Sequence, residues 1–332
     1  MKQPWTMHGL VYRVLALLAI LALIQSAIGM DRTAHLKLRR RRHGPRQPEQ
    51  STATWTDGEA TGVAVHQPWL KNVMKRPSFL AQRDPSGEQE WMDLPGQDPN
   101  DLATMFTDLR RVNRWLGGAW ITTRGLDRIF RDYPADETVT ILDVASGSVD
   151  IPRVMSNWAR RRKRPVSIIA TDINPAVLGL AHGSDTVDGV QLVAADALRL
   201  PFADDAVDVA ACSFFLHHLD PPDVIAALRE MRRVSRRSVL INDMVRGWPS
   251  FAGAWLFSRI FTRNPISRHD APLSARRSYT RVELLDLAAA AGLEPMATYG
   301  FAGYRVVLVT SDALPAPRGN PSTLAVAAVT QT

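Results

Sequence analysis

The chain has 332 residues, 40 Lys and Arg against 33 Asp and Glu, and a hydrophobic content of 45%, which is enough to fill a sizeable core. Its single cysteine, Cys212, excludes an intramolecular disulfide, and because CxxC and Cys/His clusters are absent the sequence predicts no metal site. The basic excess lies mostly in residues 1–48, whereas residues 136–311 are near neutral, which argues against a protein that binds nucleic acid.

The first predicted element is an apolar run over residues 9–30, which is close to the length that spans a bilayer. Three interpretations remain open: a membrane anchor, a signal peptide cleaved after Gly29, and a translated leader without a role. Seven Lys and Arg in residues 31–46 favour a chain that stays in the cytoplasm, anchored to the inner face of the membrane if the run is an anchor.

The pattern then changes several times along the chain. Residues 98–130 place apolar side chains at helical spacing and are broken at Gly117-Gly118, which predicts two helices that cover the main fold as a lid. The expected divisions are a hydrophobic segment (1–30), a basic and then disordered linker (31–90), the helical lid (91–135), the main domain (136–311) and a disordered tail (312–332).

Within the main domain, strand patterns alternate with helix patterns. Strands are predicted at 138–145, 166–172, 190–196, 206–215, 237–243 and 304–310, and helices at 150–162, 174–183, 221–235 and 284–292. Such alternation is typical of an α/β fold with a doubly wound, mostly parallel sheet that helices cover on both faces.

In sheets of this kind ligands bind at the carboxyl ends of the strands. Asp143 and the turn 145–150 follow the first strand, and Asp172 follows the second, at the distance from Gly147 where an acid binds ribose hydroxyls. An acid at this distance from the glycine would, by itself, also suit NAD. However, the turn is not GxGxxG, and Asp143 and Asp150 place negative charge where a pyrophosphate would lie. A cofactor with a positive centre and no phosphate is therefore favoured.

The stretches "ILDVASGSVDIP", "IIATDINPAVLGLA", "LVAADALRLPFADDAVDVAACSFFLHHLDPP" and "LREMRRVSRRSVLINDM" carry a family resemblance. Together they resemble the successive motifs of class I S-adenosylmethionine-dependent methyltransferases, most closely the ubiquinone/menaquinone C-methyltransferases and the small-molecule methyltransferases of polyketide pathways. The resemblance covers residues 136–311. It implies a Rossmann-like sheet with an antiparallel last strand and S-adenosylmethionine as the cofactor.

The resemblance also assigns roles to the residues that follow the strands. The cofactor's methionine part is implied to contact Asp143, Gly147 and Ser148, and its ribose is implied to contact Asp172. The adenine edge is implied to contact Asp196 and the Ala197 amide, and Ser213 is implied to form the wall near the sulfonium. The alternative for each acid is that it only caps the next helix or turn.

The family usually has glycine at two positions of the first turn that are occupied here by Ala145 and Val149. Alanine is expected to be tolerated if the backbone stays at negative φ. Valine is expected to be more disruptive, because its branched side chain narrows the cofactor pocket or shifts the helix.

His217 and His218 follow the fourth strand, and either is a candidate general base for deprotonating a phenol. The alternative is a structural turn that packs against the cofactor or caps the next helix. Asp220 lies close to the histidines in sequence, and further polar candidates near the mouth are Asp243, His269 and Asp270. Arg276 and Arg277 are interpreted either as steering an anionic substrate or, in preference, as a solvated basic face. An aromatic pocket or plain core is expected from Trp115, Trp120, Phe214 and Phe215.

The sequence thus predicts methyl transfer to a small aromatic, phenolic or quinone-like acceptor of the kind found in secondary metabolism, with O-methylation slightly favoured over C-methylation. Nucleic acid is not expected as a substrate, since "SFFL" stands where base-modifying amino-methyltransferases carry Asn/Asp-Pro-Pro-aromatic. Two alternatives are a nicotinamide-dependent Rossmann oxidoreductase and a degenerate, non-catalytic binding protein, for which Val149 is the best support.

Overall fold

The computed structural model describes residues 80–84, 86–184, 189–301 and 303–311. The apolar run 9–30, the linker up to residue 79 and the tail 312–332 lie outside the described residues. Among the helices that are described, none has the length and apolar character needed to cross a membrane.

The core is one seven-stranded sheet in the order β3-β2-β1-β4-β5-β7-β6. The strands are β1 (Val139–Val144), β2 (Val166–Asp172), β3 (Val190–Ala194), β4 (Val207–Ser213), β5 (Ser235–Met244), β6 (Glu294–Phe301) and β7 (Arg305–Ser311). The first five strands run parallel, and β7 pairs antiparallel with both β5 and β6. The predicted doubly wound, mostly parallel sheet is confirmed.

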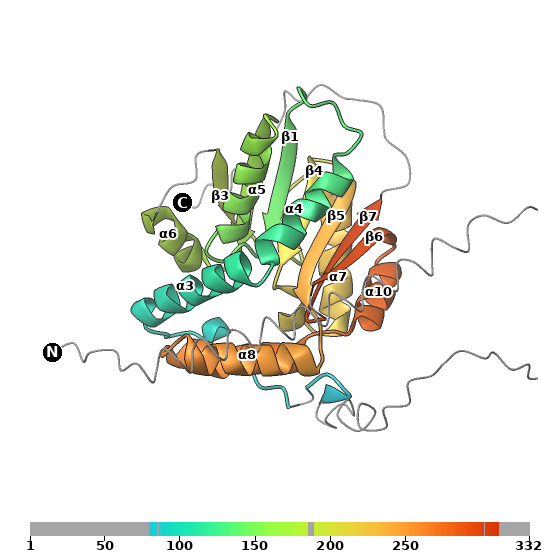
Figure 1. Ribbon diagram of the computed structural model, residues 1–332. Helices are drawn as coiled ribbons and strands as arrows, with labels where there is room; N and C mark the ends of the chain where they lie inside the picture. Colours follow the sequence, from blue (N-terminus) through green and yellow to red (C-terminus); the bar gives the residue numbers. More distant parts are fainter. Residues whose placement is uncertain (1–79, 85, 185–188, 302, 312–332) are drawn as a thin grey trace, which may run out of the picture.

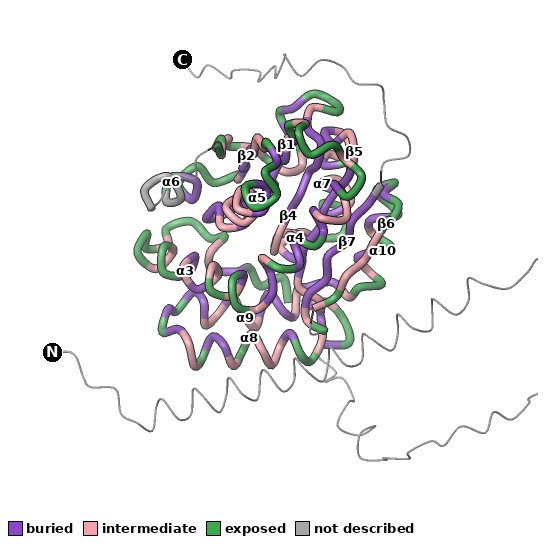
Figure 2. Tube along the Cα trace, turned by 45° about the horizontal axis from the view of Figure 1, so that its top comes forward, coloured by how far each residue is buried: buried purple, intermediate pink, exposed green. Residues whose placement is uncertain are grey.

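Helices cover both faces of the sheet because the strands are apolar on both sides. One face packs against α4 (Gly118–Ile129), α5 (Asp150–Arg161) and α6 (Pro175–Ser184), and the other against α7 (Pro221–Val234) and α10 (Arg281–Ala290). Figure 1 shows α4 and α5 in front of the sheet, with α7 and α10 behind it. Figure 2 shows β1, β4 and β7 as buried segments between these layers.

A further layer lies at the carboxyl ends of the parallel strands (Figure 1). It contains α3 (Pro99–Trp115), α8 (Trp248–Ile260), α9 (Pro265–Arg277) and the short 3-10 helices η2 (Trp91–Asp93) and η3 (Leu216–His218). The sequence analysis did not identify α8, α9 or β6. Apolar residues lie on several sides of α8, and β6 is an edge strand that contains Pro295 and Gly300, so neither has a clear periodicity.

The two helices predicted ahead of the sheet are α3 and α4, and the chain bends between them at Gly117, whose φ is 84°. Ile121 and Leu126 of α4 are fully buried against the sheet, so only α3 lies where a lid would lie. Residues 80–84 and 86–90, which the sequence places in the linker, pack against the domain: Leu80 and Glu90 are buried, and Arg83 donates to the Leu219 carbonyl at 2.8 Å.

Candidate functional site

The turn after β1 is held by bonds to the neighbouring strand β2. The Ser146 amide donates to the Thr171 carbonyl at 2.7 Å, and the Gly147 amide donates to Asp172 Oδ2 at 3.0 Å. The Ser146 hydroxyl donates to the Asp143 carbonyl at 2.9 Å. The structure therefore brings Asp143, Gly147 and Asp172 together at one edge of the sheet, as the sequence predicts.

Three residues of this turn have positive φ: Ala145 at 55°, Gly147 at 52° and Val149 at 60°. Alanine was expected to be tolerated at position 145 if the backbone stays at negative φ, and this condition is not met. The left-handed region is costly for any residue with a Cβ. The Val149 side chain is buried against Ala170 and Leu178, on the α6 side of the turn. The strain therefore lies in the backbone at Ala145 and Val149, and glycine at either position would relieve it.

The strain predicts opposite effects for glycine at two alanine positions. Ala145→Gly should raise the free energy of unfolding by about 0.5 to 1 kcal/mol, since the left-handed penalty of about 1–2 kcal/mol exceeds the entropic cost of glycine. The matched control is Ala176→Gly in the exposed first turns of α6, which should lower it by up to about 1 kcal/mol. Urea unfolding of both variants measures this, and a loss of stability in Ala145→Gly would contradict the strain.

Valine at position 149 is a different case, because its side chain is buried. Val149→Gly relieves about 1–3 kcal/mol of strain but loses the burial of a valine side chain, about 1.5–3 kcal/mol. The two contributions nearly cancel, so the valine is tolerated through its packing against Ala170 and Leu178.

Three predicted cofactor residues end in buried polar atoms without a hydrogen-bond partner among the described residues: Asp143 Oδ1, Ser148 Oγ and Ser213 Oγ. They lie at the carboxyl ends of β1 and β4, two neighbouring strands. Burial, together with the nearby carboxyls of Asp150 and Asp172, raises the pKa of Asp143 to about 8. Unpaired buried groups are costly and rare, so their grouping here is what a ligand site requires.

The two other predicted acids make local bonds. Asp172 Oδ1 accepts from the Asn174 amide at 3.0 Å, and burial raises its pKa. Asp196 is exposed and accepts from the Leu198 amide at 2.9 Å, in the turn that also contains Ala197. Asp172 and Asp196 thus each accept the local hydrogen bond that is expected of an acid capping the next helix or turn. Ile173, which no sequence pattern singled out, is a large apolar residue that is 70% exposed directly after Asp172.

Helix α3 covers the turn. A Cβ at Gly147 would lie 3.2 Å from the ring of Phe106, which is 2% exposed. Phe106 packs with Met105, Val177 and Ile266, and so joins α3 to α6 and α9. The backbone of the turn therefore lies close to the covering helix at Gly147, and a Cβ there would require Phe106 to shift by a few tenths of an ångström.

His217 lies in η3, just after β4, and is 3% exposed. Its Nδ1 is 2.7 Å from Asp243 Oδ1, and the other oxygen of Asp243 accepts from the Leu216 amide at 2.8 Å. Burial acts to raise the pKa of Asp243, but the charge and hydrogen bond of His217 lower it below its ordinary value. Asp243 therefore fixes the orientation of the His217 ring.

His218 has a different set of partners. Its Nδ1 is 2.7 Å from Asp93 Oδ2 in η2. Burial acts to lower the pKa of His218, but the carboxylates of Glu90, Asp93 and Asp243 raise it to about 9. The sequence analysis missed Glu90 and Asp93, because they lie in a stretch without periodicity more than a hundred residues from the histidines.

The remaining polar candidates hold the segment 83–93 in place. Asp270 accepts from the Trp91 and Met92 amides at 2.8 and 3.0 Å, and the His269 ring stacks on Trp91 at 4.2 Å. The other pairings are Arg83–Asp220 at 2.6 Å, Arg276–Asp84 at 2.8 Å, and Arg277 with the Glu88 and His218 carbonyls at 2.9 and 2.8 Å. These residues are occupied by structural contacts in this conformation.

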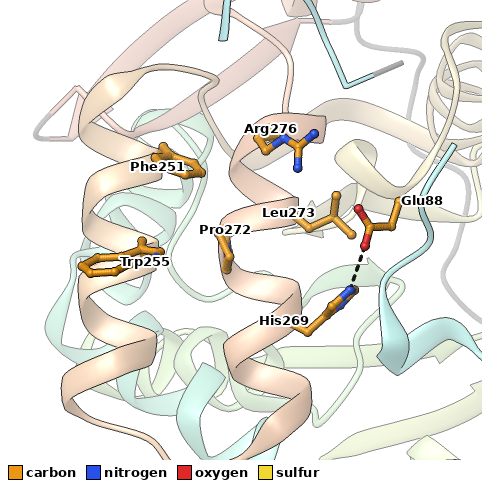
Figure 3. Close-up of a pocket in the computed structure, with 7 residues that line it drawn as sticks. All are labelled: Glu88, Phe251, Trp255, His269, Pro272, Leu273 and Arg276. Atoms are coloured by element: carbon orange, nitrogen blue, oxygen red, sulfur yellow. Dashed lines mark hydrogen bonds and ion pairs between the residues drawn. The ribbon is translucent and has the colours of Figure 1, made fainter. Parts of the chain in front are cut away.

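A cavity of about 380 Å³ lies between α8, α9 and the segment that precedes η2 (Figure 3). Figure 3 shows the His269 and Glu88 side chains joined on one side of it, with Trp255 and Phe251 on the other. Its lining residues are Glu88, Phe251, Trp255, His269, Pro272, Leu273 and Arg276. None of the predicted cofactor residues lines this cavity.

Arg305 of β7 is a buried cation that the sequence analysis did not identify. Its guanidinium lies 3.8 Å from the centre of the Phe214 ring, and its Nη2 donates to Asn113 Oδ1 at 2.9 Å. Asn113 in turn donates to Asp150 Oδ2 at 2.7 Å, so the network reaches the first turn of α5. Burial lowers the pKa of Arg305 to about 10. Of the predicted aromatic residues, Phe214 carries this contact, whereas Trp115 and Trp120 are exposed.

Two solved structures resemble this arrangement. A SAM-dependent methyltransferase from Aquifex aeolicus aligns over 65% of this chain and 98% of its own, with 15% identity and a TM-score of 0.45. Human N-acetylserotonin methyltransferase, solved in complex with SAM, aligns over 64% of this chain and 56% of its own, with 12% identity and a TM-score of 0.48.

Similarity to known sequences agrees with the motifs. A demethylmenaquinone methyltransferase from Beutenbergia cavernae is 30% identical over 169 residues, 48% of this chain and 65% of that protein. A ubiquinone/menaquinone biosynthesis C-methyltransferase from Rickettsia prowazekii is 32% identical over 118 residues, 33% of this chain and 47% of that protein. The chain thus spans less than two thirds of either relative. Residues 142–241 match the family described as "Methyltransferase domain", in agreement with the resemblance of the sequence motifs.

Proposed function

We propose that the protein transfers a methyl group from S-adenosylmethionine to a small aromatic, phenolic or quinone-like acceptor. The observation that carries this proposal is a group of three buried polar atoms, on Asp143, Ser148 and Ser213, that have no hydrogen-bond partner in the part of the chain that the structure describes; Asp172 lies beside Asp143. A cofactor with an ammonium group and ribose hydroxyls would supply the partners that these atoms lack.

The proposed contacts follow the order of the strands. Asp143, Gly147 and Ser148 would hold the methionine part, Asp172 the ribose, Asp196 and the Ala197 amide the adenine edge, and Ser213 the wall beside the sulfonium. The bound cofactor supplies an electrophilic methyl group with a good leaving group. The protein then has to align the acceptor and exclude water, and α3, α8 and α9 lie where they would cover the reacting atoms.

The histidines after β4 are the proposed groups for removing the acceptor's proton. With a pKa of about 9, the His218 ring is protonated at neutral pH and is therefore not available to accept a proton. His217 is the better candidate, because Asp243 holds its Nδ1 at 2.7 Å and leaves Nε2 as the reactive nitrogen. Loss of a phenolic proton makes both the oxygen and the adjacent ring carbons nucleophilic.

Which atom is methylated therefore depends on whether the bound acceptor presents its oxygen or its ring carbon to the methyl group. The sequence-based expectation slightly favours oxygen, whereas the names of the related quinone-pathway enzymes favour a ring carbon. Methylation of a panel of hydroxylated naphthoquinones and phenols, followed by NMR of the products, distinguishes an O-methyl from a C-methyl group.

Calorimetry tests the cofactor. We expect S-adenosylhomocysteine to bind the full-length protein with a micromolar dissociation constant and NADH not to bind at about 1 mM, a contrast of about 4 kcal/mol in binding free energy. Binding of NADH alone would favour the oxidoreductase alternative. If neither compound binds at millimolar concentration, the fold serves as a non-catalytic binding protein.

A further inference from the structure

Three side chains from two segments that are distant in sequence converge at the carboxyl end of β4. Glu90 precedes η2, and His217 and His218 are consecutive residues of η3. His217 Nε2 lies 3.8 Å from Glu90 Oε1, and His218 Nε2 lies 3.9 Å from Glu90 Oε2. One potential ligand atom from each of the three residues lies within 4.8 Å of the others. These separations are too long for hydrogen bonds.

The opposite nitrogen of each ring is bound to a carboxylate. His217 Nδ1 is 2.7 Å from Asp243, and His218 Nδ1 is 2.7 Å from Asp93. Histidines that bind metals commonly make this second contact, because it fixes the orientation of the ring and raises the basicity of the coordinating nitrogen. Here both contacts turn the Nε2 atoms toward Glu90.

Glu90 itself is 1% exposed. Its Oε2 accepts from the Ser274 hydroxyl at 2.8 Å, whereas its Oε1 has no hydrogen-bond partner within the described part of the chain. A buried carboxylate oxygen without a partner is expensive, and it faces an imidazole nitrogen at a distance that a bridging ion would span. Three carboxylates, of Glu90, Asp93 and Asp243, lie around the two imidazoles and the Arg277 cation, so with neutral imidazoles they leave a net negative charge that a divalent ion would offset.

We propose that Glu90, His217 and His218 bind one divalent transition-metal ion through a carboxylate oxygen and the two Nε2 atoms. The proposal revises the sequence-based expectation that the protein has no metal site. Two nitrogen ligands and one oxygen ligand suit zinc and its first-row neighbours, and three protein ligands leave a position open to water or another oxygen.

The separations are compatible with such an ion. Ligand atoms about 2.05 Å from a tetrahedral ion are about 3.3 Å apart, whereas one ligand atom from each of the three residues lies within 4.8 Å of the others, so these atoms have to approach one another by up to about 1.5 Å. The Glu90 carboxylate, whose Oε1 has no partner in the described part of the chain, and the partly exposed His218 ring would supply this movement. The ion would enter past His218, whose side chain is 17% exposed, and would tie the segment 86–93 to the end of β4.

The metal site does not depend on the proposed methyl transfer, since it is measured without cofactor or acceptor. The two roles do meet at His217 Nε2, which cannot both coordinate an ion and accept a proton. With the ion bound, a hydroxyl oxygen in the open position would lose its proton to solvent more readily, because a divalent ion stabilises the oxyanion.

Titration of the full-length protein with zinc and cobalt chlorides, after treatment with a chelator and dialysis, tests the site. The native protein should bind one ion per chain with a dissociation constant at or below the micromolar range. Glu90→Gln and His218→Gln should weaken binding at least tenfold, and Asp93→Asn about tenfold through the orientation of His218.

The matched control is Glu294→Gln. Glu294 is an exposed acid at the start of β6 that lies outside the three-residue cluster, so its replacement should leave metal binding unchanged. Zinc should raise the melting temperature of the native and Glu294→Gln proteins and not that of Glu90→Gln, which separates loss of the site from loss of the fold. The proposal is overturned if native protein binds no zinc at about 100 μM, or if Glu90→Gln binds it as native protein does.

Discussion

Replacing Asp172 by alanine is expected to weaken S-adenosylhomocysteine binding at least 100-fold. Two hydrogen bonds from ribose hydroxyls to a carboxylate contribute about 1.5–3 kcal/mol each, and 1.4 kcal/mol corresponds to a factor of ten. The same carboxylate accepts from the Gly147 amide at 3.0 Å, so its loss also loosens the turn that would hold the methionine part. Isothermal titration calorimetry measures the affinity directly.

Two further variants separate these contributions. Asp172→Asn keeps an oxygen for the Gly147 amide but loses the charge, and should bind S-adenosylhomocysteine about tenfold more weakly than the native protein. Asp196→Ala removes an exposed acid and should cost no more than about tenfold. If Asp172→Ala binds within threefold of the native protein, the ribose does not lie at the end of β2, and the proposed cofactor orientation fails.

The strand ends were predictable because their pattern is local. Each parallel strand is a short, largely apolar run, and the acids at the carboxyl ends of two of them, Asp143 and Asp172, have to lie at the same edge of the sheet. The sequence therefore predicted the sheet and the edge at which these acids lie, whereas their contact with a cofactor stays a prediction. The positive φ of Ala145 was not predictable, because only the bonds of the turn to β2 fix it.

The residues that were missed depend on long-range packing. Glu90 lies in a stretch without periodicity and reaches the end of β4 only because Asp270 and Arg277 hold the chain before and after it. In the sequence, Arg305 is an ordinary polar residue at the start of a strand. In the structure, its guanidinium is enclosed by residues of α3 and the loop after β4. No local pattern distinguishes a buried arginine from an exposed one.

The burial of Arg305 also fixes the bend between the two N-terminal helices. Gly118 begins α4, and a Cβ there would overlap Arg305 Nη1 and Asn113 Oδ1. Arg305 is 1% exposed, so its guanidinium cannot move aside into solvent. A side chain at position 118 would break the bond between Arg305 and Asn113 and leave a buried charge without its partner.

Gly118→Ala is therefore expected to lower the free energy of unfolding by about 3 kcal/mol or more, the usual cost of breaking one partner away from a buried charge. Urea unfolding measures it. The matched control is Gly253→Ala in α8, where a Cβ would meet nothing within 4 Å and the change should stabilise the helix by up to about 1 kcal/mol. If Gly118→Ala is as stable as the native protein, the guanidinium has room that the structure does not show.

Because the Arg305 network ends on Asp150 at the start of α5, the same variant should also weaken S-adenosylhomocysteine binding, an effect that Gly253→Ala should not share.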